Sequence, residues 1–496
     1  MPQKEAASDS SSSCIQVPEL DGFYTQPLSA GKLYRLVGSF GPAAVIASLS
    51  IGAGETIMVT GVGAWAEYGL LWLVLLSVLT KGVFVTYLLG RYTAASGQHI
   101  GPRLLQLPGP RGWLLHAIVW MELIAMTLAL AAVAKPCGNL VVYLLRASLP
   151  GSVSHATWEN LCTTLFLAAA LILSLYTSYM TLEKQQIVIC GILVGGTILS
   201  TFMIGPRVVD ALAGTFRFGH LPPAPEWAPP AVRNDYWLNV ATVFGYVGST
   251  VSPYIAYANW TSIRGFGLSG HPNIQDIRAR ADASARIDYL PDDPAEARRL
   301  RALLSPLRWD VGMGAVVLFI VTAAFMMAGA VGLYPRHLSL PGNAFDLLTR
   351  QGYIWEHLHR GLVPVYYVAV LAALWGTLAT IPEAETRVAH EFFSAIWPRF
   401  ASFPFRGLQA IIVLWFLVAS CFWIWSGVSF DLLTQIVALL ATNLGVALIC
   451  VAALYLNFKL PPRYRTRWWM LAGGVISALI LFLAFAGSAV GLLRKL

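Results

Sequence analysis

The chain has 496 residues, of which 57% are hydrophobic and only 12% are charged. Soluble domains carry about 25% charged residues, so this composition excludes a soluble globular enzyme and a disordered protein. The six cysteines are too few for a disulfide-built secreted domain. What remains is a helical protein with many membrane spans, and we attribute its net charge of +8 to basic cytoplasmic loops rather than to nucleic-acid binding.

The N-terminal segment, residues 1–36, is polar, rich in serine and without the apolar stretch of a signal peptide. We expect it to be a cytoplasmic tail, and we expect the first span to act as its own insertion signal. A spanning helix needs about 20 apolar residues, and the apolar runs that follow predict about eleven spans. Their expected positions are about 38–63, 68–90, 112–134, 158–179, 185–205, 237–261, 311–334, 361–382, 405–427, 430–456 and 468–492.

These spans divide into two halves of five and one additional helix. The expected units are a first repeat over 37–205, an outside loop over 206–236, a second repeat over 237–456 with a cytoplasmic loop over 264–308, and the eleventh helix and C-terminus over 457–496. With the N-terminus inside, 22 of the 33 lysines and arginines fall on inside segments and ten on outside segments. This asymmetry predicts a multi-pass protein of the cell membrane with a cytoplasmic N-terminus.

The loop 264–308 mixes arginines with acidic residues. Within it, residues 294–304 have the pattern of a short amphipathic helix, with Pro294 suited to the first turn. Such a helix can contact lipid or regulate the protein. The composition is also that of a solvated connector, which is the interpretation we prefer.

The first span contains an interruption at Gly52-Ala53-Gly54. Glycine is a poor helix former, and here two glycines flank one alanine. Glu55 follows directly, near the middle of the membrane. A carboxylate at that depth is costly and normally marks a functional site.

The sixth span contains a second interruption, Gly248-Ser249-Thr250-Val251-Ser252-Pro253. Proline removes a backbone hydrogen bond and clashes with the preceding turn, and the hydroxyl side chains add oxygen atoms. Irregular backbone at membrane depth persists only where it lines a cavity or packs inside protein. The two breaks occupy the same position in the two halves, which predicts an inverted-repeat transporter with its site between spans one and six.

The two broken spans resemble those of the Nramp family of divalent metal transporters. The resemblance lies in Gly41-Pro-Ala-Ala-Val-Ile-Ala-Ser48 and Gly248-Ser-Thr-Val-Ser-Pro253-Tyr-Ile-Ala-Tyr257. The latter is similar to the family pattern G-x-T-x-M-P-H-x-x-Y. The resemblance implies an all-α membrane protein with a LeuT-like 5+5 inverted repeat, about eleven helices, and breaks in helices one and six.

Several positions depart from the family pattern. The family's D-P-G-N motif is replaced by residues 52–55, so its metal-binding aspartate is absent and Glu55 stands at the asparagine position. The family's sixth-helix methionine and histidine are Ser252 and Tyr254 here. Acidic residues expected further along the third helix fall on Ala129 and Ala132. A branch of Nramp-related magnesium transporters departs from the family at the same helices.

From these features we expect a site made of oxygen atoms. The candidate metal ligands are Glu55, Gly52, Ser249, Ser252 and Gln435, the last because Thr434-Gln435 resembles the family's tenth-helix Ser-Gln. The candidate residues of the helix breaks and gate are Ala53, Gly54, Gly248, Thr250, Pro253 and Tyr254. The candidate relay residues are Glu122 and Asn259. Glu383 and Glu385, with Arg387, are interpreted as a cytoplasmic charge cluster at the end of the eighth span.

Oxygen ligands favour hard ions such as Mg²⁺, and Mn²⁺ also accepts them, whereas a methionine thioether selects softer ions. The missing acidic and histidine groups weaken the case for proton coupling, because a relay needs titratable groups. We therefore expect transport of a divalent cation by alternating access, without enzymatic chemistry and without a cofactor. Its expected partners are the metal ion and the lipid bilayer.

Two alternatives remain open from the sequence. The same fold could carry a small organic solute such as an amino acid, with Glu55 contacting an amine or hydroxyl. The chain could also be a membrane sensor or assembly partner that does not transport, acting through the loop 264–308.

Overall fold

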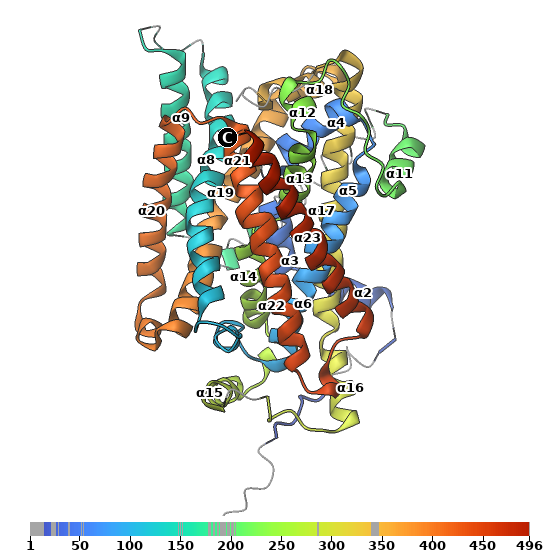
Figure 1. The fold of residues 1–496 in the computed structure, drawn as a ribbon, viewed down its shortest axis with the longest axis vertical. Helices are drawn as coiled ribbons and strands as arrows, with labels where there is room; N and C mark the ends of the chain where they lie inside the picture. Colours follow the sequence, from blue (N-terminus) through green and yellow to red (C-terminus); the bar gives the residue numbers. More distant parts are fainter. Residues whose placement is uncertain are drawn as a thin grey trace, which may run out of the picture.

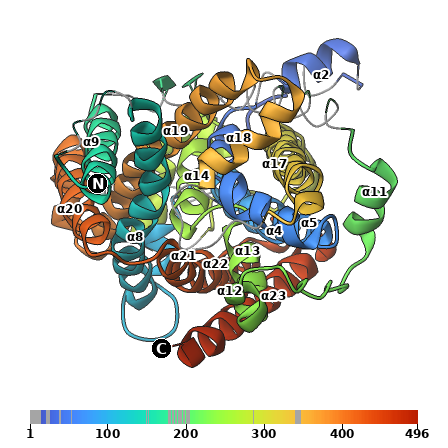
Figure 2. The same ribbon diagram turned by 90° about the horizontal axis from the view of Figure 1, so that it is seen from above.

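The computed structural model describes residues 14–20, 29–37, 40–50, 54–146, 152–176, 205–284, 287–338 and 347–495, together with Gly52 and a few isolated positions. Every element assigned in these ranges is helical, which confirms the predicted all-α class. Figure 1 shows long helices running side by side along the longest axis of the molecule. Seen from above, they form one bundle around α14 and α13 (Figure 2).

The helices of the bundle are α3 (Pro42–Ser50), η1 (Gly54–Val59), α4 (Thr60–Ala66), α5 (Leu71–Ser77), η2 (Val78–Val85), α6 (Thr86–Ser96), α8 (Trp113–Leu145), α9 (His155–Ser174), α13 (Tyr236–Tyr246), α14 (Val251–Ile263), α17 (Ser305–Gly332), α19 (Leu362–Ile396), α20 (Phe405–Trp425), α21 (Phe430–Val437), η6 (Ala438–Leu444), α22 (Gly445–Lys459) and α23 (Trp468–Lys495). Shorter helices connect them: α2 (Ala30–Val37), α7 (Gly101–Leu104), α11 (Val208–Phe216), α12 (Pro230–Asn234), η3 (Gly267–Gly270), α15 (Ile274–Ser284), α16 (Pro294–Leu303), η4 (Tyr334–Arg336), α18 (Leu347–Leu358), η5 (Pro398–Ser402) and η7 (Pro462–Tyr464).

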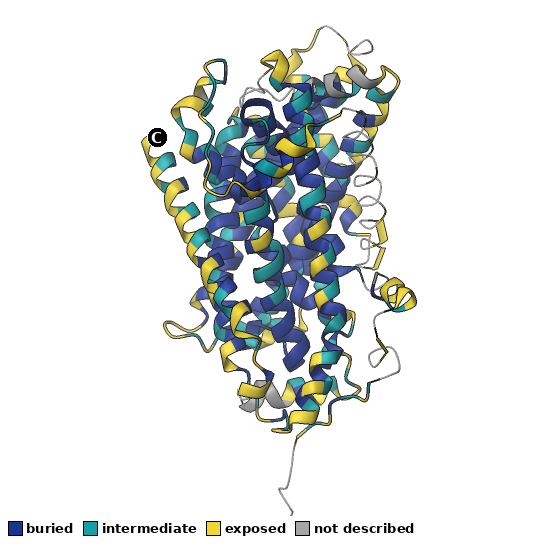
Figure 3. Ribbon diagram, turned by 90° about the vertical axis from the view of Figure 1, so that its right-hand side faces the viewer, coloured by how far each residue is buried: buried dark blue, intermediate teal, exposed yellow. Residues whose placement is uncertain are grey.

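Eight helical stretches in the described ranges are long and apolar enough to cross a membrane. Two further stretches, α3 to α4 and α13 to α14, are interrupted within the bundle. Apolar side chains cover the outward faces of the bundle, as on α23, where Leu479 and Leu483 are exposed (Figure 3). The predicted fifth span, 185–205, falls almost wholly outside the described residues, so the count of eleven stays a prediction.

Both predicted helix breaks are present. In the first, α3 ends at Ser50 and η1 begins at Gly54. In the second, α13 ends at Tyr246 and α14 begins at Val251. Gly248 lies between α13 and α14 with φ +102°, a conformation that side chains rarely adopt. The helix is interrupted here within the core, and Val247 and Val251 on either side of the break are fully buried.

The described N-terminal segment packs against the loop 264–308. The Ile15 backbone N–H donates to the Tyr289 carbonyl (2.9 Å), and the Val17 N–H donates to the Glu296 carboxylate (2.8 Å). This places both segments at the end of the bundle that carries α15 and α16, while the C-terminus lies at the other end (Figure 1). The predicted inside segments therefore share one end; which end is cytoplasmic stays a prediction.

The loop 264–308 is more ordered than a solvated connector. The predicted helix over 294–304 is present as α16, capped by the Asp293 side chain, which accepts from the Ala295 N–H. Tyr289 is fully buried, and its hydroxyl donates to the Ser96 carbonyl (2.6 Å). The Arg278 guanidinium donates to the Gly97 carbonyl (2.9 Å). The loop is thus bonded to the end of α6.

Helices α4 and α17 approach each other at Gly329. A Cβ added there would lie 2.1 Å from the Thr60 carbonyl oxygen, whereas a Cβ at Gly312 of the same helix would contact nothing within 4 Å. We expect Gly329→Ala to destabilise the protein by about 1–3 kcal/mol, because the added methyl group forces the backbones of α4 and α17 apart. Gly312→Ala should be neutral or slightly stabilising. Thermal unfolding of the purified variants measures the difference, and equal midpoints would contradict this packing.

Candidate functional site

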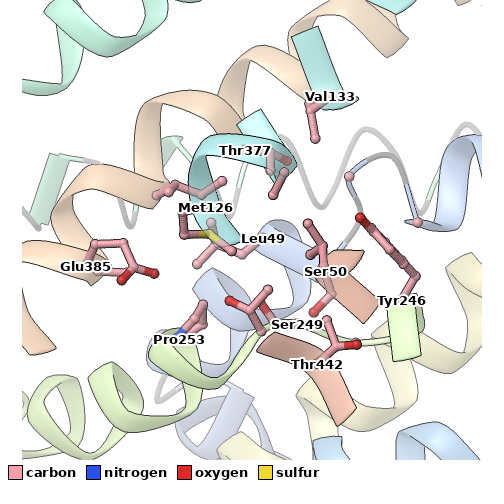
Figure 4. A pocket seen from close by; sticks show the side chains of 18 residues that line it. Leu49, Ser50, Met126, Val133, Tyr246, Ser249, Pro253, Thr377, Glu385 and Thr442 are labelled. Carbon is pink, nitrogen blue, oxygen red and sulfur yellow. The ribbon is translucent and has the colours of Figure 1, made fainter. Parts of the chain in front are cut away.

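A cavity of about 60 Å³ lies at the level of the two helix breaks. It is enclosed by both breaks and by α8, α19 and the α21–η6 segment. Its polar lining residues are Ser50, Tyr246, Ser249, Thr250, Thr377, Glu385 and Thr442. Figure 4 shows Glu385 on one side of the cavity and Tyr246 with Thr442 on the other. The polar donors that surround the space are oxygen atoms, and Met126 contributes a sulfur atom.

Glu385 supplies the carboxylate of this lining. It lies on α19, which continues to Ile396, so Glu385 is inside the bundle and only 3% exposed. The predicted cytoplasmic charge cluster is therefore wrong for this residue. Glu383 does pair with Arg387, but it is also buried. We expected the eighth span to end near residue 382, because a span needs only about 20 residues. The helix α19 instead has 35 residues and continues past Glu385.

Glu122 of α8 approaches Glu385 from the other side of the α14 N-terminus. Its Oε1 accepts from the backbone N–H groups of Val251 (2.8 Å) and Ser252 (3.3 Å), which is a favourable position for a carboxylate at a helix N-terminus. The Ser252 hydroxyl donates to Glu385 Oε2 (2.9 Å). Ser252 thus donates to both buried carboxyl groups, to Glu122 through its backbone N–H and to Glu385 through its hydroxyl. Two such groups repel each other unless a proton or a cation lies between them.

Glu55 connects the two breaks. It is fully buried, and its Oε1 accepts from the Gly248 N–H (3.1 Å). Its Oε2 has no hydrogen-bond partner among the described residues. Glu55 is not among the residues that line the cavity, although its neighbour Gly54 is. Glu55 thus contacts the sixth-span break, but its predicted role as a metal ligand stays a prediction.

Lys81 is a buried residue next to the second break that the sequence analysis did not single out. It is fully buried on η2, and its ammonium donates to the carbonyls of Phe244 and Gly245 (2.7 Å each) at the end of α13. It also attracts Glu55 electrostatically. A cation is stabilised at a helix C-terminus, so Lys81 satisfies carbonyls that the break leaves without helical partners. The available signal was a lysine within an apolar span.

The other described residues of the first break, Gly52 and Gly54, make backbone contacts. Gly52 lines the cavity, and its carbonyl accepts from the Thr56 N–H (3.1 Å) and hydroxyl (2.7 Å). Gly54 packs so closely on α13 that an added Cβ would lie 2.8 Å from the Tyr246 carbonyl oxygen. Ala53 is outside the described residues.

Some residues of the second break line the cavity, and others stabilise the break or orient Glu385. Ser249, Thr250 and Pro253 line the cavity. The Tyr254 hydroxyl accepts from the Ser249 N–H (2.9 Å), which stabilises the backbone of the break. Ser252 does not line the cavity and instead orients Glu385.

Two predicted site residues lie apart from the cavity. Gln435 is buried on α21, where its side-chain oxygen accepts from Lys495 (3.2 Å). Thr442 of η6 lines the cavity in its place. Asn259 donates to Glu391 Oε2 (2.5 Å) near α7 and is not joined to Glu122.

Asp310 of α17 fixes the start of the first broken helix. Its carboxylate accepts from the N–H groups of Gly41 (2.9 Å) and Ala43 (3.0 Å) and from the Tyr257 hydroxyl (2.9 Å). The residue is fully buried. A single carboxylate thus ties α3, α14 and α17 together at the end that carries α16.

Comparisons with known proteins agree with this geometry. The family model Nramp, described as natural resistance-associated macrophage protein-like, matches residues 43–489. Two solved structures of mutants of the Eremococcus coleocola manganese transporter are similar to this chain. One is 12% identical over 93% of this chain and 87% of the other, with TM-score 0.59. The second is 13% identical over 95% and 88%, with TM-score 0.59. At this identity the likeness shows the fold, and comparison with curated proteins gave no match.

The Glu55–Lys81 pair can be tested with a double-mutant cycle. Lys81→Met removes the donor to the Phe244 and Gly245 carbonyls and a positive charge near Glu55, so we expect a loss of about 1–3 kcal/mol in stability. Glu55→Gln should restore the electrostatic part of that loss in the double variant, so the two effects should not add. Thermal unfolding midpoints of the purified proteins provide the measurement.

Lys135→Met is the matched control for that cycle, because Lys135 donates to the Val428 carbonyl (3.4 Å), away from Glu55. Its effect should add to that of Glu55→Gln. Additive losses for Lys81→Met and Glu55→Gln would show that the two charges are not coupled.

Proposed function

The chain belongs to the Nramp family, and on that premise we propose that it moves a divalent cation, Mg²⁺ or Mn²⁺, across the cell membrane by alternating access around the cavity. The family consists of membrane transporters, so the chain is a multi-pass transport protein and not an enzyme. Metal-ion transport is the activity of the family; the choice of ion, the coupling and the orientation are our proposals.

The observation that carries the metal proposal is the acid pair at the cavity. Glu385 lines it, and Glu122 lies next to it, because Ser252 donates to both carboxyl groups. A divalent cation beside this pair removes the repulsion between the two carboxyl groups. Hydroxyl oxygens of Ser249, Thr250 and Thr442 surround the same space. Carboxylate and neutral oxygens suit a partly hydrated hard ion.

Glu55 has a complementary role in this proposal. In the present state Lys81 balances its charge, and its contact with Gly248 holds the breaks together. We propose that Glu55 becomes a ligand of the ion when the two half-helices move and its hydrogen bond with the Gly248 N–H is broken. In this proposal the ion is contacted directly by Gly52 and Ser249, which line the cavity. Ser252 acts through its hydrogen bond to Glu385. Gln435 reaches the ion only in another conformation.

The size of the cavity argues against an organic solute. About 60 Å³ is far below the roughly 300–1,000 Å³ of pockets for small organic ligands. Transport driven by the membrane potential suits a divalent ion, because each charge gains about 2.3 kcal/mol per 100 mV. We propose that this gradient suffices without a proton, and that the end with α16 and its arginines is cytoplasmic.

Flux in proteoliposomes tests the proposal. We expect uptake of Mg²⁺ or Mn²⁺ by the native protein, and a fall of at least about tenfold in Glu385→Gln and Glu55→Gln, equal to about 1.4 kcal/mol. Internal pH should stay constant during uptake. Glu356→Gln is the control, since Glu356 is 44% exposed and pairs with Arg360. Absence of divalent uptake in the native protein would refute the metal proposal, and internal acidification would refute uncoupled transport.

Met126 provides a separate test of ion class. Met126→Leu removes the sulfur at nearly constant volume. If the transported ion is hard, the ratio of Mg²⁺ to Mn²⁺ uptake should change by less than about twofold, because thioethers bind softer ions. A selective loss of Mn²⁺ uptake in this variant would place the sulfur in the ion's coordination shell and argue against a purely oxygen-based site.

A further inference from the structure

A second hollow, of about 840 Å³, lies away from the transport cavity. It is bounded by η2 and α6, by α16 and the start of α17, and by the segment that leads into α23. Figure 1 places α16 near the end of α23 at the lower end of the bundle. Five arginines line it: Arg91, Arg301, Arg308, Arg465 and Arg467.

The arginines of this hollow are not balanced by acidic groups. Its lining contains no aspartate or glutamate, and none of the five forms an ion pair within the part of the chain that the structure describes. Arg91 is only 4% exposed and donates to the Asn457 side chain (3.1 Å) and the Tyr464 carbonyl (2.5 Å). Arg301 and Arg308 lie close enough to repel it. The hollow therefore concentrates positive charge that an anion would relieve.

One wall of the hollow is apolar. Leu79, Val83 and Phe84 of η2 and Trp469 and Met470 of α23 line it. Leu79 and Val83 precede Arg91 by eight to twelve residues on one continuous helical stretch, a rise of about 12–18 Å. Leu79 and Val83 thus extend the apolar wall from the arginines toward the middle of the bundle, while Trp469 and Met470 line it beside Arg467.

We propose that this hollow binds one anionic phospholipid, with its phosphate on the arginines and its acyl chains along the apolar wall. Guanidinium groups match phosphate oxygens in geometry and charge. Basic pockets between spanning helices suit lipid headgroups. A soluble phosphate compound would satisfy the arginines but leave the apolar wall bare, so the lipid is the better match. The site is independent of the metal proposal, because lipid binding is measured without transport.

Native mass spectrometry of the purified full chain tests this site with phosphatidylglycerol and phosphatidylcholine of identical acyl chains. We expect one phosphatidylglycerol to bind at least about tenfold more tightly than phosphatidylcholine. Arg301→Gln with Arg308→Gln should weaken it by about tenfold or more, and Arg467→Gln by about fivefold, since each basic group near the surface contributes similarly. Glycerol phosphate at the same concentration should not displace the lipid.

Arg298→Gln is the matched control, because Arg298 is exposed on α16 but does not line the hollow. It should bind phosphatidylglycerol like the native protein. Equal binding of the two lipids, or an equal loss in Arg298→Gln, would overturn the proposal. Displacement by glycerol phosphate would show a soluble phosphate site instead. Thermal unfolding midpoints measured in phosphatidylcholine alone show whether each variant is folded. If the double variant Arg301→Gln with Arg308→Gln does not fold, Arg467→Gln alone tests the site.

Discussion

The buried ammonium of Lys81 is the interaction on which the centre of the bundle depends. It satisfies two carbonyls that the second break leaves without helical partners, and it balances Glu55. Glu55 in turn holds the Gly248 N–H of the same break. At membrane depth an unsatisfied backbone group costs several kcal/mol. One lysine and one glutamate therefore allow two irregular segments to exist side by side in the core.

This arrangement separates two tasks that the sequence assigns to one residue. Glu55 and Lys81 each bond to the backbone of the second break and stabilise it, while Glu385 and Glu122 supply carboxyl groups at and beside the cavity. Ser252 links the second break to Glu385 through its hydroxyl. Movement of either half-helix would thus alter both pairs together. The two helix breaks are thus linked to Glu55, Lys81 and Glu385 by hydrogen bonds.

The breaks were predictable from the sequence because their causes are local: glycines at 52 and 54, and proline at 253 beside small hydroxyl residues. The family resemblance rested on the same segments. Lys81, Glu385 and Asp310 were not predictable as site or anchoring residues, because their partners lie 53 or more positions away in the chain. Periodicity reveals that a span is apolar, but not which helix will face its polar residues.

The contacts of Asp310 have a thermodynamic consequence for access to the cavity. Three hydrogen bonds to this one carboxylate fasten α3 and α14 to α17 at the end that carries α16. Bonds to a charged group contribute about 1.5–3 kcal/mol each, so parting these helices at that end is steeply unfavourable in the empty protein. Any conformation in which α3 and α14 part from α17 at that end must therefore recover this free energy from new contacts, or from a ligand that binds it more tightly.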